Sequence, residues 1–356
     1  MHLEKRSYDI IIGNKILKDL ARYLAKLKIG RDAYIITNLL IKNKYGKLLE
    51  KALKKKGFSL RFKIVADTEK SKSIETASSV VKDLTLYDKK RNIFIIAFGG
   101  GVVGDLAGFV ASIYKRGTPY IQIPTTLLAQ VDSSIGGKTA VDLEVGKNLV
   151  GAFYQPKLVF SDIQLLKTLD LRQIRSGLAE VIKYGIIKDR KLFNYLEKNY
   201  RDILNLRPKA LEFIVWRSSI IKAAIVEQDE REEKGLRTIL NFGHTLGHAL
   251  EAASGFKGYN HGEAIALGML LAAKISRCYG LINTALAVSI EDLIKKIGLP
   301  VRIKGASLKS IIEAHYRDKK FVGQRNRFVL IRGIGRTTIV ENIPLSIIKT
   351  ALKQRL

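Results

Sequence analysis

Short apolar runs alternate with amphipathic runs over the first ~160 residues, and this alternation limits the fold more than any other feature of the sequence. Runs rich in β-branched and aromatic residues predict strands at 32–38, 59–67, 92–100 and 119–124. The segments between them have a helical period and predict helices at 40–56, 73–88 and 104–115. An earlier run, YDIIIGNKIL at 8–17, favours a pair of short strands. Strands and helices in this order are typical of a parallel or mixed sheet with helices on its faces.

The pattern changes after Asp162 to longer apolar-periodic segments separated by glycines and polar turns. The helices expected there are 171–188, 207–229, 237–254, 261–279 and 288–297. A short β pair follows at 327–341, with Gly333 and Gly335 at its turn. The sequence therefore predicts an α/β domain over residues 1–160 and a mainly helical domain over residues 161–356.

Charge and cysteine content restrict the compartment and the partners. The single Cys278 cannot form an internal disulfide, and no apolar run reaches the length of a membrane span or a signal peptide, so we expect a cytoplasmic protein without a membrane partner. The net charge of +29 raises nucleic-acid binding as an alternative. The lysines are scattered over predicted solvated helix faces, so we expect no nucleic-acid partner. A positive field would equally attract a small, multiply anionic substrate.

The run FIIAFGGGVVGDLAG leads from a predicted strand through a glycine triplet toward a predicted helix. Gly99, Gly101 and Gly104 match G-x-G-x-x-G, a pattern whose backbone N–H groups can bind a pyrophosphate at a helix start. The standard fingerprint also has an acid at the end of the next strand, whereas PYIQIP is followed here by Thr125 and Thr126. A tight strand-to-helix turn with close packing is therefore the structural alternative.

Polar loops next to this turn favour a nucleotide site in a different geometry. Glu69 and Lys72 follow the strand at 59–67 and offer ribose and adenine contacts, while Asp132 and Lys138 follow the strand at 119–124. Either loop could instead be solvated surface. Further basic and amide residues lie beside glycines or next to motifs and could either bind anions or lie at the surface: Lys147, Asn148, Lys222, Arg237, Asn241, Lys319 and Lys320.

Three of the five histidines fall within eighteen residues, at His244, His248 and His261. The i, i+4 spacing puts His244 and His248 on one helix face, so spacing alone selects them as a ligand pair for zinc. Glu180 is a candidate carboxylate ligand because it lies among apolar residues, although it could simply pair with Lys183 on the same face. The alternative for each histidine is a hydrogen-bonded core residue.

Read together, these motifs resemble the 3-dehydroquinate synthase family of sugar-phosphate cyclases. The resemblance runs in order from about Glu69 to Phe321. The motifs that carry it are GGGVVGDLAGFVAS, QIPTTLLAQVDSSIGGKTAVD, GKNLVGAFYQPK, GLAEVIKYGII, NFGHTLGHALE, HGEAIALGM and RDKK. It implies an α/β N-terminal domain that binds NAD, a mostly α-helical C-terminal domain that binds a divalent metal, Zn²⁺ or Co²⁺, and a homodimer.

The resemblance also assigns residues by their place in the motifs. It makes Glu180, His244 and His261 the metal ligands and so moves His248 from the ligand pair to the substrate side. The implied NAD contacts are Glu69, Lys72, Gly99, Gly100, Gly101, Asp105, Thr125, Thr126, Lys138 and Lys147. The implied catalytic residues are Lys138, Lys183, Lys222, Arg237, Asn241 and His248. The implied substrate-binding residues are Arg116, Asp132, Lys147, Asn148 and Lys320, with Arg116 reaching the phosphate site of a neighbouring subunit.

The reaction implied by the resemblance converts 3-deoxy-D-arabino-heptulosonate 7-phosphate to 3-dehydroquinate and phosphate, the second step of chorismate and aromatic amino acid biosynthesis. Two enzyme alternatives stay open: a metal-dependent dehydrogenase of the glycerol or iron-alcohol type, which would release NADH, and a cyclase that makes a cyclitol from another sugar phosphate. The chain departs from the family at Asp67 and Thr68, where Pro-Gly is common, and at Asn38, where an acid is common. These departures concern the adenosine end of NAD.

Overall fold

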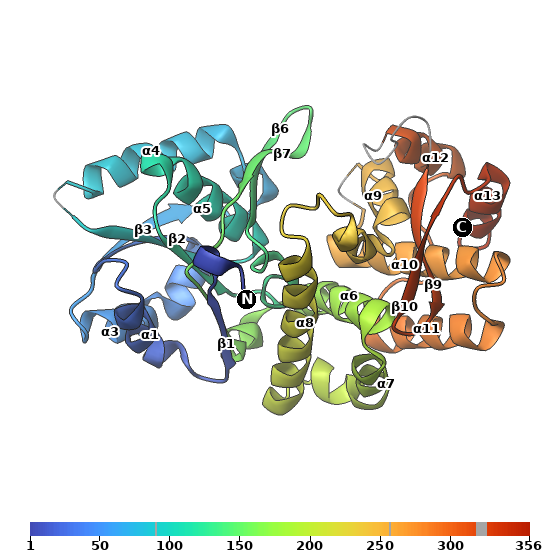
Figure 1. The fold of residues 1–356 in the computed structure, drawn as a ribbon, viewed down its shortest axis with the longest axis horizontal. Helices are drawn as coiled ribbons and strands as arrows, with labels where there is room; N and C mark the ends of the chain where they lie inside the picture. Colours follow the sequence, from blue (N-terminus) through green and yellow to red (C-terminus); the bar gives the residue numbers. More distant parts are fainter. Residues whose placement is uncertain (90, 256–257, 318–325) are drawn as a thin grey trace. The chain divides into compact units, whose positions relative to one another are not determined.

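The computed structural model describes residues 1–89, 91–255, 258–317 and 326–356 (Figure 1). Lys319 and Lys320 lie outside the described residues. The chain divides into two compact units, which we call the first unit (1–169 with 211–231) and the second unit (170–210 with 232–356).

This division differs from a single boundary after residue 160, because residues 211–231 return to the first unit. They carry most of helix α8 (Pro208–Gln228). The Lys222 ammonium lies 2.8 Å from a carboxylate oxygen of Asp132, and Arg6 forms an ion pair of 2.8 Å with Glu230. Such contacts join residues far apart in the sequence, so periodicity alone could not place this segment.

The first unit is built on a six-stranded parallel sheet with strand order β1-β8-β5-β4-β2-β3. Its strands are β1 (Asp9–Gly13), β2 (Asp32–Asn38), β3 (Ser59–Val65), β4 (Ile93–Gly99), β5 (Tyr120–Pro124) and β8 (Leu158–Asp162). The four strands predicted between residues 32 and 124 are confirmed to within two residues at each end. The order reverses between β2 and β4, and ligands of parallel sheets bind at the carboxyl ends of strands beside such a reversal.

The predicted strand pair at 8–17 is wrong, because only β1 forms there. Lys15 turns the chain with a φ of 61°, and a 3-10 helix follows at Leu17–Asp19. The backbone N–H groups of Lys15 and Leu17 each donate to the Asp162 carboxylate at 2.9 Å. These bonds hold the segment as a turn, so it is not available to pair with β1.

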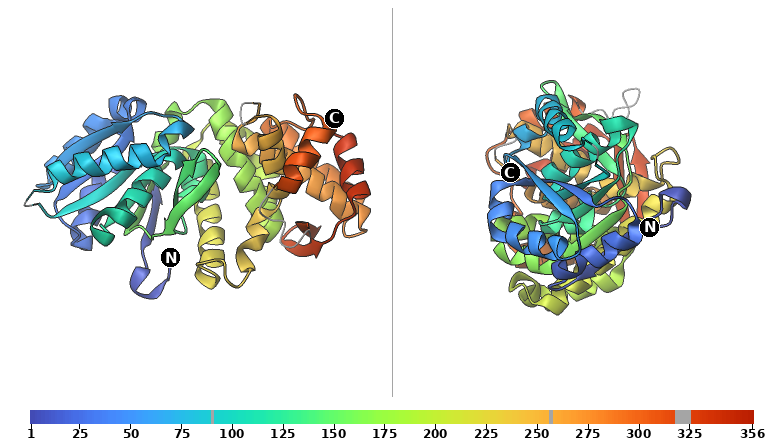
Figure 2. Two further views of the ribbon diagram at one scale, coloured as in Figure 1. Left: turned by 90° about the horizontal axis from the view of Figure 1, so that it is seen from above. Right: turned by 90° about the vertical axis from the view of Figure 1, so that its left-hand side faces the viewer.

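Helices cover both faces of the sheet (Figures 1 and 2). Ile35 and Ile96 pack with α1 (Leu20–Leu27) and α3 (Lys47–Lys54), whereas Ile36 and Ile95 pack with α4 (Ile74–Tyr87) and α5 (Gly101–Ile113). Alternate residues of one strand point to opposite faces, so burial of both faces explains why β2 and β4 are apolar throughout. The one-turn helix α2 (Leu39–Ile41) precedes a π-helical turn and α3.

The antiparallel hairpin of β6 (Lys138–Leu143) and β7 (Gly146–Phe153) was not predicted. It packs on α5 so closely that a Cβ at Gly108 would lie 2.4 Å from Thr139 Cγ2. Helix α5 also begins at Gly101, three residues before the predicted start. Gly101, Gly104 and Gly108 therefore lie inside the helix, and Gly108 allows its close approach to the hairpin.

The second unit is mainly helical. Its helices are α6 (Leu171–Lys188), α7 (Arg190–Leu204), α9 (His244–Ala253), α10 (His261–Cys278), α11 (Thr284–Ile297), α12 (Leu308–Arg317) and α13 (Leu345–Lys353). A hairpin of β9 (Arg327–Gly333) and β10 (Arg336–Glu341) confirms the predicted β pair. Helix α10 is buried on nearly all sides and its Leu267, Leu271 and Ile275 form a core with α9 and β9. Among the described residues, no helix combines the length and apolarity needed to span a membrane.

Candidate functional site

Three helices of the second unit bring Glu180, His244 and His261 together. Glu180 lies in the middle of α6 and is fully buried, while the two histidines are the first residues of α9 and α10. The Glu180 Oε1 atom lies 3.4 Å from His244 Nε2 and 3.1 Å from His261 Nε2, and one donor atom from each residue lies within 4.8 Å of the others. Two imidazoles and one carboxylate form a ligand set typical of catalytic zinc, with a position left open for substrate.

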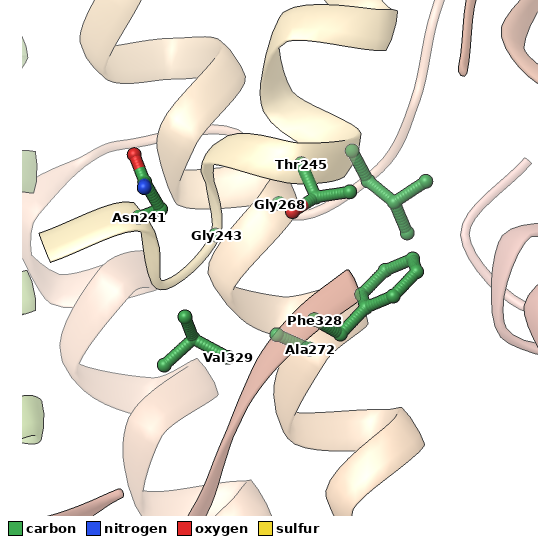
Figure 3. A pocket seen from close by; sticks show the side chains of 8 residues that line it. Asn241, Gly243, Thr245, Gly268, Ala272, Phe328 and Val329 are labelled. Carbon is green, nitrogen blue, oxygen red and sulfur yellow. The ribbon is translucent and has the colours of Figure 1, made fainter. Parts of the chain in front are cut away.

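A glycine contact sets the place of His244. The helix predicted at 237–254 forms instead as two pieces, a 3-10 helix at Leu236–Asn241 and α9. Gly243, which precedes His244 and has a φ of 80°, lies between the two pieces. A Cβ added at Gly268 of α10 would lie 1.9 Å from the Gly243 carbonyl oxygen, so the two backbones are in direct contact (Figure 3). The start of α9 is therefore fixed against α10.

We expect Gly243→Ala to lower the free energy of unfolding by about 3 kcal/mol, from left-handed backbone strain and overpacking. A Cβ there would lie 2.7 Å from Met269 Cγ and 2.8 Å from Met269 N. Gly280→Ala is the matched control, because Gly280 has a φ of 65° but no atom within 4 Å of the added Cβ. It should lose only about 1–2 kcal/mol. Denaturant unfolding of both variants measures the difference, and equal losses would contradict the packing argument.

The start of α10 is fixed against α6 in a similar way. The Gly262 backbone N–H donates to Ser176 Oγ at 3.0 Å, and a Cβ at Gly262 would lie 2.3 Å from Ser176 Cα. Asn260 and Glu263 form a capping box at this helix start. Glu263, two residues after His261, also accepts two hydrogen bonds of 2.7 Å from Arg172, which occupy its carboxylate. One turn after Ser176, Glu180 therefore faces His261.

Charges around the cluster keep its carboxylate ionised. Lys183, one turn along α6, forms an ion pair with Glu180. Burial raises the pKa of Glu180, but Lys183 and His244 lower it more, so the net shift is well below the usual range. Burial lowers the pKa of His244. Burial also lowers the pKa of His261, but hydrogen bonds to Glu180 and Glu251 outweigh it and raise this pKa to about 10.

Glu251 is a member of this group that the sequence interpretation did not select. Its Oε1 atom lies 3.5 Å from His261 Nδ1, on the opposite side of the ring from Glu180. His248, Glu251 and His261 form a second set of donor atoms within 4.8 Å of one another. The spacing of His248 and Glu251, three residues apart on a helix, was the available signal.

Metal binding to the metal-free protein at pH 8 is expected to release about one proton, because a ligand histidine must be neutral. We expect His261 to supply that proton, because its pKa is raised to about 10. Affinity for a divalent metal should therefore rise about tenfold per pH unit between pH 7 and 9. Proton release in weak buffer and chelator competition measure both effects. Glu251→Gln should reduce the number of protons released, because it removes a carboxylate that raises the pKa of His261. Unchanged proton release in this variant would contradict the expectation that His261 is the source of the proton.

In the first unit, the glycine turn lies at the carboxyl end of β4, next to the order reversal of the sheet. Gly100 caps α5, and a Cβ on it would lie 3.0 Å from Thr126 Cγ2. Thr125 N–H donates to the Gly99 carbonyl at 2.9 Å. Gly100 and Gly101 are half-buried and place no side chain over the start of α5, where the first N–H groups of a helix can bind a pyrophosphate.

Lys72 is the centre of an ionic network beside this turn. It is buried and its ammonium lies 2.6 Å from Asp105 Oδ2 and 4.0 Å from Asp142, and it also binds the Asn148 side chain. Burial lowers the pKa of Lys72, but Asp105 and the nearby carboxylates raise it overall. Asp105 lies in the second turn of α5 rather than at the helix start. Sequence reasoning missed Asp142, which also accepts from the Asn148 N–H at 2.8 Å.

The remaining predicted residues are distributed over both units. Lys222 donates to the Asp132 carbonyl at 2.7 Å, and Lys147 lies 3.4 Å from Glu69. Arg237 is buried and pairs with Glu232 at 3.3 Å. Lys138 and Arg116 are exposed, and Asn241 lies in the segment before Gly243.

Comparison with known proteins identifies the family. The family models for the N-terminal and C-terminal parts of 3-dehydroquinate synthase match residues 62–176 and 177–321. The chain belongs to the 3-dehydroquinate synthase family. The 3-dehydroquinate synthase of Desulforamulus reducens is 45% identical over 99% of this chain and 98% of its own length, and that of Thermoanaerobacter pseudethanolicus is 45% identical over 98% of each. The family expected from the motifs is confirmed, and the chain is an enzyme of the lyase class.

Solved structures place the fold among the sugar-phosphate cyclases. A 2-epi-5-epi-valiolone synthase of Streptomyces hygroscopicus, solved with NAD⁺ and Zn²⁺, has a TM-score of 0.90 and is 28% identical, covering 99% of this chain and 98% of that chain. A 2-deoxy-scyllo-inosose synthase solved with carbaglucose-6-phosphate, NAD⁺ and Co²⁺ has a TM-score of 0.89 and is 27% identical, covering 98% and 97%. A probable glycerol dehydrogenase from Sinorhizobium meliloti is 16% identical with a TM-score of 0.65 and shares the fold alone.

Proposed function

We propose that this member of the 3-dehydroquinate synthase family converts 3-deoxy-D-arabino-heptulosonate 7-phosphate to 3-dehydroquinate and phosphate, with NAD and a divalent metal as cofactors. The observation that carries the proposal is the cluster of Glu180, His244 and His261. Similar chains of 45% identity that bear this enzyme's name support it. The reaction serves chorismate and aromatic amino acid biosynthesis.

The donor set fits a divalent metal. A buried carboxylate and two imidazoles with Nε2 atoms facing it offer nitrogen and oxygen ligands, and we assign Zn²⁺ as the metal because it prefers this set, with Co²⁺ as a substitute. When bound there, a divalent metal supplies Lewis acidity that lowers the pKa of a substrate hydroxyl. Glu180 stays ionised beside Lys183 and so provides the negative charge of the ligand set.

The first unit, residues 1–169 with 211–231, fits a dinucleotide at the carboxyl ends of its strands. The residues assigned to it are Glu69, Lys72, Gly99, Gly100, Gly101, Asp105, Thr125, Thr126, Lys138 and Lys147. When bound, NAD would supply both a hydride acceptor and a hydride donor, so that the overall reaction has no net redox change. Asp105, held by Lys72, offers a fixed acceptor for the amide of the nicotinamide.

Side chains of the protein bind and orient a substrate that carries both a phosphate and a carboxylate. The substrate contacts assigned are Arg116, Asp132, Lys147, Asn148 and Lys320. The catalytic roles are assigned to Lys138, Lys183, Lys222, Arg237, Asn241 and His248, which supply oriented positive charge and move protons. Lys222 is held by two contacts to Asp132, which fixes its ammonium for an anion. The departing phosphate can take the proton lost in the β-elimination.

We also assign the chain to the cytoplasm, as a homodimer without a nucleic-acid or membrane partner. Metal binding is assigned to the second unit, residues 170–210 with 232–356. Size measurement in solution tests the dimer. A shift assay at physiological salt tests nucleic acid, and tight, sequence-selective binding would overturn that part.

The cyclitol-forming alternative is tested by substrate choice. The purified metal-loaded protein is given NAD with either the heptulosonate phosphate or a heptulose phosphate that lacks the carboxylate. We expect 3-dehydroquinate, identified by mass spectrometry, from the first and negligible turnover of the second. Faster turnover of the compound without a carboxylate would replace the proposed substrate.

A further inference from the structure

The connection between α5 and β5 holds an unusual backbone. Lys115, Arg116 and Gly117 have φ values of 49°, 62° and 132° in succession. In the described part of the chain, this is the one place where two adjacent residues other than glycine are left-handed. Side chains with a Cβ rarely adopt this conformation, and it persists only where the surroundings fix it.

Contacts on both sides fix this turn. The buried Tyr114 donates its hydroxyl to Asp88 Oδ2 at 2.8 Å, and Lys115 forms an ion pair with the same carboxylate. The Gly117 N–H donates to the Tyr114 carbonyl at 3.0 Å, and Thr118 Oγ1 donates to that carbonyl at 3.1 Å. Asp88 is itself buried at the C-terminal end of α4, so the turn is anchored to the body of the first unit.

Arg116 is the exception within this turn. Its side chain is exposed, and its guanidinium makes no hydrogen bond or ion pair with the residues that the structure describes. Its neighbours on either side are held by Asp88 and by backbone hydrogen bonds, so the strained turn fixes the backbone of Arg116 while its charge stays available.

We propose that Tyr114 and Asp88 are positioning residues that hold the left-handed turn so that Arg116 presents its guanidinium to the substrate phosphate. The inference rests on the proposed function for the anion itself. A planar guanidinium binds phosphate through two parallel hydrogen bonds, and that geometry depends on where its backbone is held. A flexible turn would lose conformational entropy each time phosphate binds. The anchored turn is already ordered, so it avoids this cost of binding.

The test is a double-mutant cycle of Tyr114→Phe and Arg116→Ala in the full-length enzyme. Arg116→Ala should raise both KM for the heptulosonate phosphate and the inhibition constant of inorganic phosphate by about 10- to 100-fold. Tyr114→Phe alone should raise them about 3- to 10-fold, but less than about twofold when Arg116 is already alanine. Asp88→Asn should follow Tyr114→Phe, with a larger loss because the pair with Lys115 is lost as well.

Tyr34→Phe is the matched control, because Tyr34 is buried and donates to the Asp83 carboxylate at 2.7 Å elsewhere in the first unit. Tyr34→Phe should lower the free energy of unfolding about as much as Tyr114→Phe does. It should leave KM for the heptulosonate phosphate and the inhibition constant of inorganic phosphate unchanged. Equal losses from Tyr114→Phe with and without Arg116 would overturn the inference, as would a phosphate effect of Tyr34→Phe. Failure of the wild-type enzyme to turn over the heptulosonate phosphate would instead overturn the proposed function.

Discussion

His261→Ala is expected to lower the affinity for Zn²⁺ by more than about 100-fold, because loss of an outer-shell partner alone already lowers metal affinity by 10- to 100-fold. Turnover should fall with the metal content. The variant removes one of the three ligand groups, so that only Glu180 and His244 remain to bind the metal. NAD affinity should stay within about twofold, because the predicted NAD contacts belong to the first unit. Metal analysis after dialysis measures the metal content, and titration with NAD measures the NAD affinity.

His2→Ala is the control for this variant, since His2 is exposed and belongs to the first unit. It should retain metal, NAD and turnover. A His261→Ala protein that folds and keeps one equivalent of tightly bound metal would remove His261 from the ligand set. The second donor group, His248 with Glu251, would then be the next site to substitute.

Asp105→Ala should produce the reciprocal result, with NAD affinity lowered about 10- to 100-fold and metal content unchanged. The substitution removes the assigned acceptor for the nicotinamide amide. It also removes the closest carboxylate to the buried Lys72 ammonium, 2.6 Å away, which leaves that charge poorly compensated. Calorimetric titration with NAD on the metal-loaded protein gives the affinity directly.

Asp83→Ala serves as its control, because Asp83 is also a paired carboxylate of the first unit and lies 2.7 Å from an Arg61 nitrogen. Removing it should reduce stability without changing NAD affinity. If Asp105→Ala binds NAD as tightly as the wild type and turns over normally, the assignment of Asp105 to the cofactor fails.

The strands β2, β4 and β5 were predictable because burial on both faces makes them continuous apolar runs, whereas β8, which is equally buried, was not predicted. The residues 32–38, for example, form β2 without a change of boundary. Helix α6 was also predicted at its observed bounds, 171–188. Local sequence carries the information in these cases, since an apolar run or a helical period is enough to specify the element.

Other features depended on contacts between distant residues. Residues 211–231 have the helical pattern of their neighbours, and only tertiary contacts such as Lys222 with Asp132 place them in the first unit. Spacing alone selected His244 with His248, whereas the structure gathers His244 with His261 and Glu180 across three helices. Glu251 was overlooked because its contact with His261 exists only once α9 and α10 pack together.

In the proposed reaction, the enzyme releases phosphate from the substrate and consumes no NAD. The most direct test incubates the metal-loaded protein with NAD and the heptulosonate phosphate, and follows inorganic phosphate and the absorbance of NADH in the same sample. We expect many equivalents of phosphate per protein without net NADH. Accumulation of NADH in proportion to substrate consumed, without release of phosphate, would contradict it and favour a dehydrogenase.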